Sequence, residues 1–339
     1  MAGVSREVRL VGRPEGEPGE ELFEVAETPI PAPAEGEILV RNAYFSVDPY
    51  MRPRMNATRS YAASFELGEA LHGGAIGRVE ESRNPAFAVG DWVLHGLGWR
   101  EWALSGGTAV RVIDPSLAPV STALGVLGMP GLTAYHGIFE IGKPKEGEVV
   151  LVSGAAGAVG SAAGQMAKIA GCRVIGSAGS PGKLAWLREL GFDEVFDYRE
   201  KSPHDALREL APEGIDIYFD NVGGDHLEAA IGSLRMYGRI VACGSISLYN
   251  EPEAPPGPRN LFLVVTKRLL MQGYIISDHY AEFPEFLGRA GEWVRDGRLR
   301  HRETVVEGIE NAPAAFIGLF TGENIGKMLV KVGPGPEGA

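Results

Sequence analysis

A strand-like apolar run that passes directly into a glycine-rich turn constrains this chain more than any other feature. The segment Val149-Val-Leu-Val-Ser-Gly-Ala-Ala-Gly-Ala-Val-Gly160 carries glycines at 154, 157 and 160, and the small and apolar residues that follow predict a helix over 161–170. Glycine allows a sharp turn and a close approach of the backbone to a bound group, and the unpaired N–H groups that begin a helix bind phosphate. With a second strand predicted at 172–177, this order of elements predicts a dinucleotide-binding unit.

Length and charge limit the classes of protein to consider. A chain of 339 residues exceeds the size at which one hydrophobic core keeps growing, so we expect two domains. Its net charge of −12 argues against nucleic acid or an anionic membrane as a partner. No apolar run approaches the roughly 18 residues of a membrane-spanning helix, and the N-terminus lacks the apolar core of a signal peptide. We therefore expect a cytoplasmic protein.

The predicted elements change in character along the chain. Short strands separated by turn signals, for example at 37–44 and 74–80, indicate a partly barrel-like β domain over 1–126. Strands then alternate with helical stretches over 127–303, which implies an α/β fold with a doubly wound, Rossmann-type parallel sheet. The segment 304–339 contains a helix and a last strand, and we expect it to pack on the first domain. The strands predicted in the middle region are 149–153, 172–177, 193–196, 215–220, 238–243 and 270–276.

Beyond the glycine turn, five short motifs are informative as a set. They are, in chain order, Ser46-Val-Asp-Pro-Tyr-Met-Arg52, Leu127-Gly-Met-Pro-Gly-Leu-Thr-Ala-Tyr135, Asp220-Asn-Val-Gly-Gly224, Cys243-Gly-Ser-Ile-Ser-Leu-Tyr-Asn250 and Gly322-Glu-Asn-Ile-Gly-Lys327. Together they resemble the zinc-independent leukotriene 12-hydroxydehydrogenase/prostaglandin reductase family of medium-chain dehydrogenases/reductases, with bacterial NADPH-dependent curcumin and alkenal reductases as nearest kin. The resemblance covers nearly the whole chain. It implies a GroES-like β domain beside the Rossmann domain.

The residues after the second predicted strand decide between NAD and NADP. A carboxylate at that point binds the ribose diol of NAD and repels a 2′-phosphate. This chain has Gly176-Ser-Ala-Gly-Ser180 there, without an acid, and Lys183 follows near the start of the next predicted helix. An ammonium group beside a helix N-terminus suits a phosphate dianion, although Lys183 alone also fits a solvated surface lysine. The missing acid and the resemblance together predict NADP(H) as the cofactor.

The resemblance also implies a set of cofactor-binding residues. In this assignment Tyr198 lies at the adenosine phosphate end, Asn221 near the ribose and Thr133 near the nicotinamide. For Asn221 and Asn324, a turn or helix cap is the alternative interpretation. The full set is Thr133, Gly157, Ala158, Val159, Gly160, Lys183, Tyr198, Asn221, Cys243, Gly244, Ser245, Ile246, Ser247, Leu248, Tyr249, Tyr274, Ile275, Ile276 and Asn324.

Metal ligands are missing where the zinc-dependent relatives need them. Those relatives carry a cysteine in an early loop and a His-Glu pair about twenty residues later, whereas this chain reads Phe45-Ser-Val-Asp-Pro-Tyr50, and no glutamate follows His72 directly. The two cysteines, Cys172 and Cys243, lie in apolar strand-like runs and are interpreted as small buried side chains. We therefore expect no metal site.

Without zinc to polarise an alcohol, the expected reaction is reduction of a carbon–carbon double bond conjugated to a carbonyl group. Negative charge then develops on the carbonyl oxygen, which needs a hydrogen-bond donor. Tyr249 is the predicted donor, acting directly or through the ribose hydroxyl of the cofactor. Tyr50 is predicted to contact the small-molecule enone or alkenal. Apolar packing is the alternative for both tyrosines.

Two other functions fit the same scaffold, a quinone reductase and a non-catalytic NADPH-binding protein. The physiological substrate depends on loops at 53–66 and 250–260 whose conformation the sequence does not define. The apolar run Leu269-Leu-Met-Gln-Gly-Tyr-Ile-Ile276 is predicted to form an edge strand. Because an unpaired edge is a liability, we expect a homodimer in which a second copy covers it.

Overall fold

The computed structural model describes residues 3–336, and the chain divides into two compact units. Unit 1 comprises Met1–Leu124 and Glu303–Ala339, and unit 2 comprises Gly125–Arg302. The outer ends of the predicted domains, residues 1–2 and 337–339, lie outside the described residues. Within residues 3–336, no helix combines the length and the apolar character needed to cross a membrane.

Unit 2 is built on a six-stranded sheet in which every neighbouring pair of strands is parallel. The order is β10-β9-β8-β11-β12-β13, so the chain winds outward from β8 on one side and resumes at β11 on the other. This doubly wound order confirms the predicted Rossmann-type sheet. Such sheets bind ligands at the carboxyl ends of the strands where the order reverses, here β8 and β11. The strands are β8 (Val149–Val152), β9 (Arg173–Ala178), β10 (Glu194–Asp197), β11 (Ile215–Asp220), β12 (Leu234–Ala242) and β13 (Leu270–Gly273).

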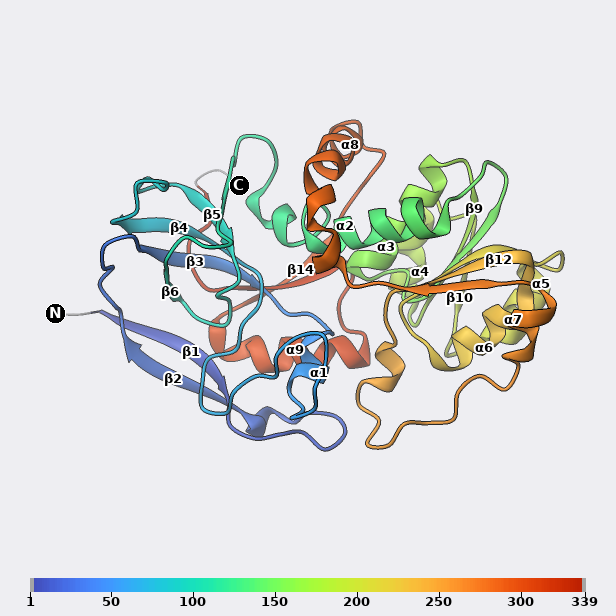
Figure 1. Cartoon of the computed structure of the whole chain (residues 1–339), viewed down its shortest axis with the longest axis horizontal. Coiled ribbons are helices and arrows are strands. Elements are labelled where there is room, and N and C mark those ends of the chain that lie inside the picture. The colour runs from blue at the N-terminus through green and yellow to red at the C-terminus, as the bar shows by residue number, and fades with distance from the viewer. Residues whose placement is uncertain (1–2, 337–339) are drawn as a thin grey trace. The chain divides into compact units, whose positions relative to one another are not determined.

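Helices connect these strands and cover both faces of the sheet. Figure 1 shows α3 on one side of the sheet and α6 and α7 on the other. All four residues of β8 are buried, as expected for a central strand with helices on both faces. The helices of unit 2 are α2 (Met129–His136), which continues into the π-helix η3 (Gly137–Gly142), α3 (Ala158–Ile169), α4 (Pro181–Glu189), α5 (Pro203–Leu210), α6 (Gly224–Ser233), α7 (Phe262–Thr266) and α8 (Phe283–Arg295).

Three boundaries differ from the sequence predictions by three or more residues. Helix α3 begins at Ala158 instead of 161, because the extended backbone of Gly157 already forms its N-cap. Strand β12 begins at Leu234 instead of 238, and Tyr237 within it has a positive φ of 63° that interrupts the apolar alternation. The strand predicted over 270–276 ends at Gly273, where its pairing with β12 stops.

Unit 1 contains a seven-stranded mixed sheet and a separate antiparallel pair, β1 and β2. The order in the large sheet is β14-β15-β3-β4-β5-β7, with β6 pairing with β3. This separate mixed-sheet domain confirms the second part of the predicted fold class. Its elements are β1 (Val4–Leu10), β2 (Phe23–Pro29), β3 (Ile38–Ser46), α1 (Met51–Arg54), β4 (Ala75–Ser82), β5 (Trp92–His95), β6 (Trp102–Ser105), β7 (Arg111–Ile113), β14 (Glu303–Glu307), α9 (Ala312–Thr321) and β15 (Lys327–Lys331).

The C-terminal segment completes the core of unit 1. Strand β15 pairs antiparallel with β3, with Leu329 opposite Ser46. Phe316 of α9 packs edge-on against Trp99, with ring centroids 6.1 Å apart, and Trp99 stacks on Phe45 at 5.6 Å. The last part of the chain therefore buries apolar surface of the N-terminal part.

Candidate functional site

The turn between β8 and α3 brings backbone N–H groups to the carboxyl end of the sheet. Gly154 has a φ of +56°, and a Cβ on Gly160 would stand 2.4 Å from the Gly154 carbonyl oxygen. Both positions therefore need glycine. Gly157 is the N-cap of α3, and no side chain caps this helix. The N–H groups of Ala158, Val159 and Gly160 have no partner within the helix and are the groups that bind phosphate in such folds.

A buried carboxylate joins the ends of β8 and β11. Asp220 is 2% exposed and accepts hydrogen bonds from the Tyr218 hydroxyl at 2.7 Å and from the Gly223 N–H at 2.8 Å. Burial raises the pKa of the Asp220 carboxyl, and these hydrogen bonds oppose the rise. Beside it, the Asn221 amide donates to the carbonyl oxygen of Ser153 at 2.7 Å. This network holds Asn221 next to the glycine turn.

The segment after β12 folds back on the end of β11. The N–H groups of Cys243 and Gly244 both donate to the carbonyl oxygen of Asp220 at 2.9 Å. Farther along, the Ser245 N–H donates to the hydroxyl oxygen of Tyr249 at 3.3 Å. The short 3-10 helix η4 (Ile246–Leu248) lies between these two residues. The predicted set 243–249 is therefore one hydrogen-bonded loop at the switch point of the sheet.

Two cations and an aromatic ring follow β9 and β10. Lys183 lies in the first turn of α4, and its partial burial, followed by the nearby charge of Arg199, lowers its pKa. The two cations repel each other, and an anion bound between them would offset this repulsion. The Tyr198 ring covers Gly179, where an added Cβ would lie 2.8 Å from it, and the His226 ring lies 5.4 Å away.

A hydrogen bond joins Thr133 on α2 to Tyr274, which directly follows β13. The Tyr274 hydroxyl donates to the carbonyl oxygen of Thr133 at 2.7 Å, and the Thr133 hydroxyl donates to the carbonyl oxygen of Met129 at 2.8 Å. Burial raises the pKa of the Cys243 thiol to about 12 and the pKa of Tyr274 well above its usual value. Both groups stay protonated at neutral pH, so Cys243 supplies neither a nucleophile nor a thiolate ligand.

The remaining predicted site residues belong to unit 1. Tyr50 precedes α1 and packs against the aromatic core of that unit. The side-chain amide of Asn324 donates to the carbonyl oxygen of Gly326 at 2.8 Å, a contact within its own turn. Roles for Tyr50 at the substrate and for Asn324 at the cofactor stay predictions.

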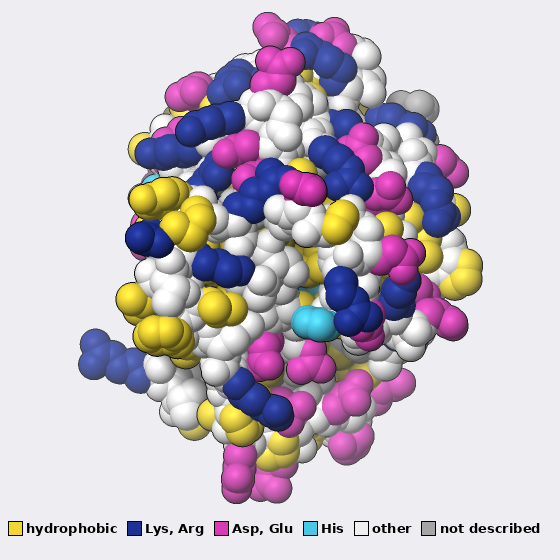
Figure 2. All heavy atoms as spheres, turned by 90° about the vertical axis from the view of Figure 1, so that its right-hand side faces the viewer, with side chains coloured by type: hydrophobic (Ala, Val, Ile, Leu, Met, Phe, Trp, Pro, Cys, Tyr) yellow, Lys and Arg dark blue, Asp and Glu magenta, His cyan; other side chains and the backbone are white. Residues whose placement is uncertain are grey.

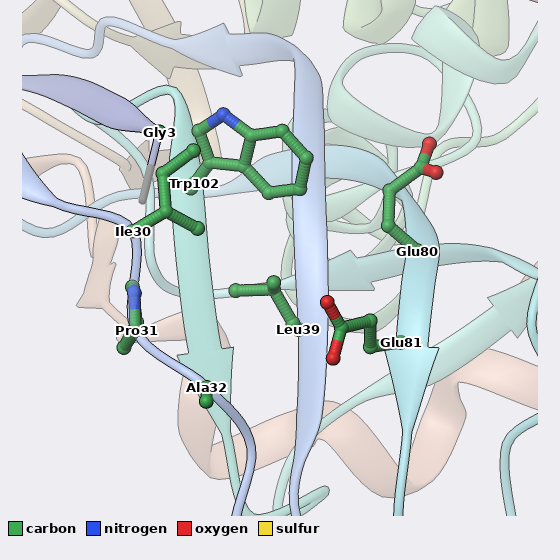
Figure 3. A pocket seen from close by; sticks show the side chains of 8 residues that line it. All are labelled: Gly3, Ile30, Pro31, Ala32, Leu39, Glu80, Glu81 and Trp102. Atoms are coloured by element: carbon green, nitrogen blue, oxygen red, sulfur yellow. The ribbon is translucent and has the colours of Figure 1, made fainter. Parts of the chain in front are cut away.

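A hollow in unit 1 has a different character. Its volume is about 420 Å³, and Figure 3 shows the Trp102 indole and the carboxylates of Glu80 and Glu81 around Leu39. Two carboxylates and no cation line it, so it does not offer the positive charge that a nucleotide phosphate needs. Among the described residues, the geometry that suits a nucleotide phosphate therefore lies in unit 2.

Comparisons with known proteins agree with this arrangement. A family model described as the N-terminal domain of oxidoreductase matches residues 6–113, and one described as zinc-binding dehydrogenase matches residues 158–292. The putative NADP-dependent oxidoreductase YfmJ of Bacillus subtilis (strain 168) is 48% identical over 336 residues, which cover 98% of this chain and 99% of that protein. The chain belongs to the zinc-independent medium-chain dehydrogenase/reductase family.

Two further members of the medium-chain family are similar over most of their length. A 2-alkenal reductase (NADP(+)-dependent) of Nicotiana tabacum is 44% identical over 301 residues, covering 87% of each chain. The crystal structure of CurA in complex with NADPH from Vibrio vulnificus has a TM-score of 0.93 at 43% identity, covering 97% of this chain and 99% of that one. The family resemblance indicated by the five motifs is confirmed.

For this medium-chain reductase, sequence reasoning missed three residues around the site. Arg199 directly follows the predicted Tyr198, and its basic character was an available signal. Asp220 opens one of the five motifs, but only the structure shows that its carboxylate organises the turn. His226, whose ring nitrogen lies 3.0 Å from the Ser177 hydroxyl, is on α6, 49 positions farther along the chain, and gives no local signal.

Proposed function

We propose that this protein is an NADPH-dependent reductase of carbon–carbon double bonds conjugated to a carbonyl group, as in α,β-unsaturated aldehydes and ketones. One observation carries the proposal: an uncapped helix N-terminus at the switch point of a Rossmann-type sheet, with the cations Lys183 and Arg199 near the ends of neighbouring strands. The names of the relatives, an NADP-dependent oxidoreductase and a 2-alkenal reductase, support the cofactor and the reaction class.

The residues of unit 2 fit NADP(H). Helix α3 begins after Gly157 without a side-chain cap, so its first N–H groups suit a pyrophosphate. Lys183 and Arg199 are assigned to the 2′-phosphate, and Asn221 to a ribose. Loops 243–249 and 274–276 are assigned to the nicotinamide. When bound, NADPH supplies the hydride that reduces the β-carbon of the substrate.

The chain supplies a donor for the charge that develops on the substrate's carbonyl oxygen. A hydroxyl that accepts one hydrogen bond, as Tyr249 does from the Ser245 N–H, also has a proton to donate. We assign this donation to Tyr249, directly or through the ribose 2′-hydroxyl, and we assign Tyr50 to substrate contact. The α-carbon then takes its proton from solvent or from an acid.

A panel of enones, alkenals and quinones tests the reaction class. The purified protein is mixed with NADPH and each compound, and nicotinamide absorbance is followed. Turnover with enones or alkenals is expected, and product analysis should show a saturated carbonyl compound. Activity with benzoquinones alone would identify a quinone reductase instead, and NADPH binding without oxidation by any compound would identify a non-catalytic protein.

Dialysis against a chelator tests whether the reduction requires a metal ion. Prolonged dialysis against a strong chelator should leave the rate of double-bond reduction unchanged, because the donors assigned above are all protein groups. Loss of turnover that returns only on addition of Zn²⁺, in a protein whose denaturation midpoint is unchanged by the chelator, would contradict the assigned mechanism.

We also propose that the protein is a homodimer joined at β13. This strand ends the sheet order, and Leu270 and Met271 on it are 49% and 44% exposed. Phe262 and Val265 on α7 and Tyr237 on β12 are also largely exposed. Figure 2, which views the side of Figure 1 where α5 and α7 are labelled, shows hydrophobic side chains grouped among charged ones. A monomer mass by light scattering at micromolar concentration would contradict the proposal.

A further inference from the structure

Three side chains of metal-binding type meet at the end of α2, and the proposed function assigns a role to none of them. His136 is the last residue of α2, and His279 and Glu282 lie on the 3-10 segment η5 (Ile276–Glu282). Glu282 is 146 positions from His136 in the chain, so no local spacing reveals the cluster. Their ligand atoms all lie within 4.8 Å of one another.

The Glu282 carboxylate contacts both imidazoles. The Nδ1 atom of His136 lies 3.0 and 2.9 Å from the two carboxylate oxygens of Glu282, and Nδ1 of His279 lies 3.3 Å from Oε1. A tetrahedral ion with bonds of about 2.0–2.2 Å holds neighbouring ligand atoms roughly 3.3–3.6 Å apart. The three ligand atoms lie within 4.8 Å of one another, so binding requires the half-exposed His279 and Glu282 side chains to rotate toward the buried His136.

The surroundings hold the ligands in place and leave a route for an ion. The His136 side chain is only 6% exposed and packs against the Tyr274 ring, with centroids 5.2 Å apart. The side chains of His279 and Glu282 are 35% and 29% exposed. One buried and two half-exposed ligands form a site that is anchored on one side and open to solvent on the other.

We propose that His136, His279 and Glu282 bind a divalent transition-metal ion, with Zn²⁺ as the best-matched species. Two imidazoles and one carboxylate suit Zn²⁺ and its first-row neighbours, whereas Mg²⁺ and Ca²⁺ prefer oxygen ligands. Three protein ligands leave a fourth position for water. In the structure, the Glu282 carboxylate lies between the two Nδ1 atoms, 2.9 Å from that of His136 and 3.3 Å from that of His279.

The ion would fix the segment that follows β13 to α2 at a second point. The Tyr274 hydroxyl already fixes the start of this segment to the Thr133 carbonyl oxygen on α2. Coordination by His279 and Glu282 would fix its end to His136 on the same helix. The site is thus structural, and its test needs neither cofactor nor substrate.

Titration of the metal-free protein with Zn²⁺, in competition with a chromophoric chelator, measures the site directly. One ion per chain is expected, and Co²⁺ should give the strong visible absorption of four-coordinate cobalt. His279→Gln and Glu282→Gln should each weaken binding at least about tenfold, since loss of even an outer-shell partner costs about 10–100-fold. The control His204→Gln removes a 70%-exposed histidine beside Asp205 and should change neither affinity nor stoichiometry.

Three results would overturn the site. The first is no stoichiometric binding at micromolar Zn²⁺. The second is unchanged Zn²⁺ affinity in both His279→Gln and Glu282→Gln. The third is an equal loss of Zn²⁺ affinity in His204→Gln, which would indicate adventitious binding to surface histidines. Thermal unfolding without metal shows whether each variant is folded. His279 and Glu282 are half-exposed, so their variants test the site without removing the buried His136 side chain.

Discussion

The Lys327 ammonium donates a hydrogen bond to the Asp48 carboxylate at 2.8 Å, although 279 positions separate the two residues in the chain. Both are buried, at 4% and 7% exposure. The same ammonium donates to the carbonyl oxygen of Val47 at 2.9 Å, and the Ser46 hydroxyl donates to the other side of the carboxylate. Two of the five motifs that carried the family resemblance therefore meet in one ion pair that anchors β15 beside β3.

Lys327→Met is expected to destabilise unit 1 strongly. It leaves the Asp48 carboxylate buried without its cation, a loss that typically costs about 3–5 kcal/mol. Denaturant unfolding measures the change in the free energy of unfolding. The control Lys331→Met, on the same strand, removes a surface pair with Glu307 at 3.2 Å and should cost about 0–1 kcal/mol. Similar losses in the two variants would show that burial of the Asp48 pair does not matter.

Local pattern was enough to predict most of the fold. The apolar run of β8, the glycine turn and the proline that begins α4 each act over a few residues, so their structures can be read from adjacent positions. The start of α3 was misplaced because a glycine N-cap and a glycine turn look alike in sequence. The Asp48–Lys327 pair and the contact of His136 with Glu282 depend on tertiary packing, so no local period contains them.

Burial of His226 predicts a loss of stability in mild acid. Desolvation lowers the pKa of this imidazole to about 4, against 6.5 for an exposed histidine. Above pH 6.5 the group is neutral in both states. As the pH falls from 6.5 to 4, the unfolded chain binds a proton that the folded chain does not, so the folded state loses roughly 3 kcal/mol.

Urea unfolding at several pH values measures this effect. His226→Gln should flatten the fall in unfolding free energy between pH 6.5 and 4, because the titrating group is gone. The exposed His204→Gln on α5 is the matched control and should keep the acid sensitivity. An unchanged pH profile in His226→Gln would assign the acid sensitivity to other groups, of which buried His95, with a pKa lowered to about 4, is the first to test.

Cofactor choice is expected to depend on Lys183. Lys183→Ala should weaken NADPH binding by about 1.5–3 kcal/mol, the range for a charged hydrogen bond, and leave NADH binding nearly unchanged. Arg199→Ala should act in the same direction and less strongly, because Arg199 is exposed. Titrations of both cofactors measure the effect, with the exposed Arg188→Ala on the same helix as the control. Equal losses for NADPH and NADH would show that Lys183 does not contact the 2′-phosphate.

The chemical step is expected to depend on the hydroxyl of Tyr249. Tyr249→Phe keeps the ring and removes the donor, together with the acceptor of the Ser245 N–H. Loss of one oxyanion donor typically lowers kcat by about 10²–10³-fold. A donor that acts through the ribose hydroxyl should cost less, about tenfold, because the ribose remains as a partial substitute. The two routes therefore predict different sizes of effect.

Cofactor titration separates the two routes further. A donor that contacts the substrate directly leaves NADPH affinity almost unchanged in Tyr249→Phe, whereas a donor bound to the ribose weakens it measurably. The lost acceptor for Ser245 affects both cases, and the denaturation midpoint of the variant measures that contribution by itself. Single-turnover oxidation of NADPH then reports the chemical step. If its rate is unaltered and only stability falls, Tyr249 serves packing, and another group must hold the charge on the carbonyl oxygen.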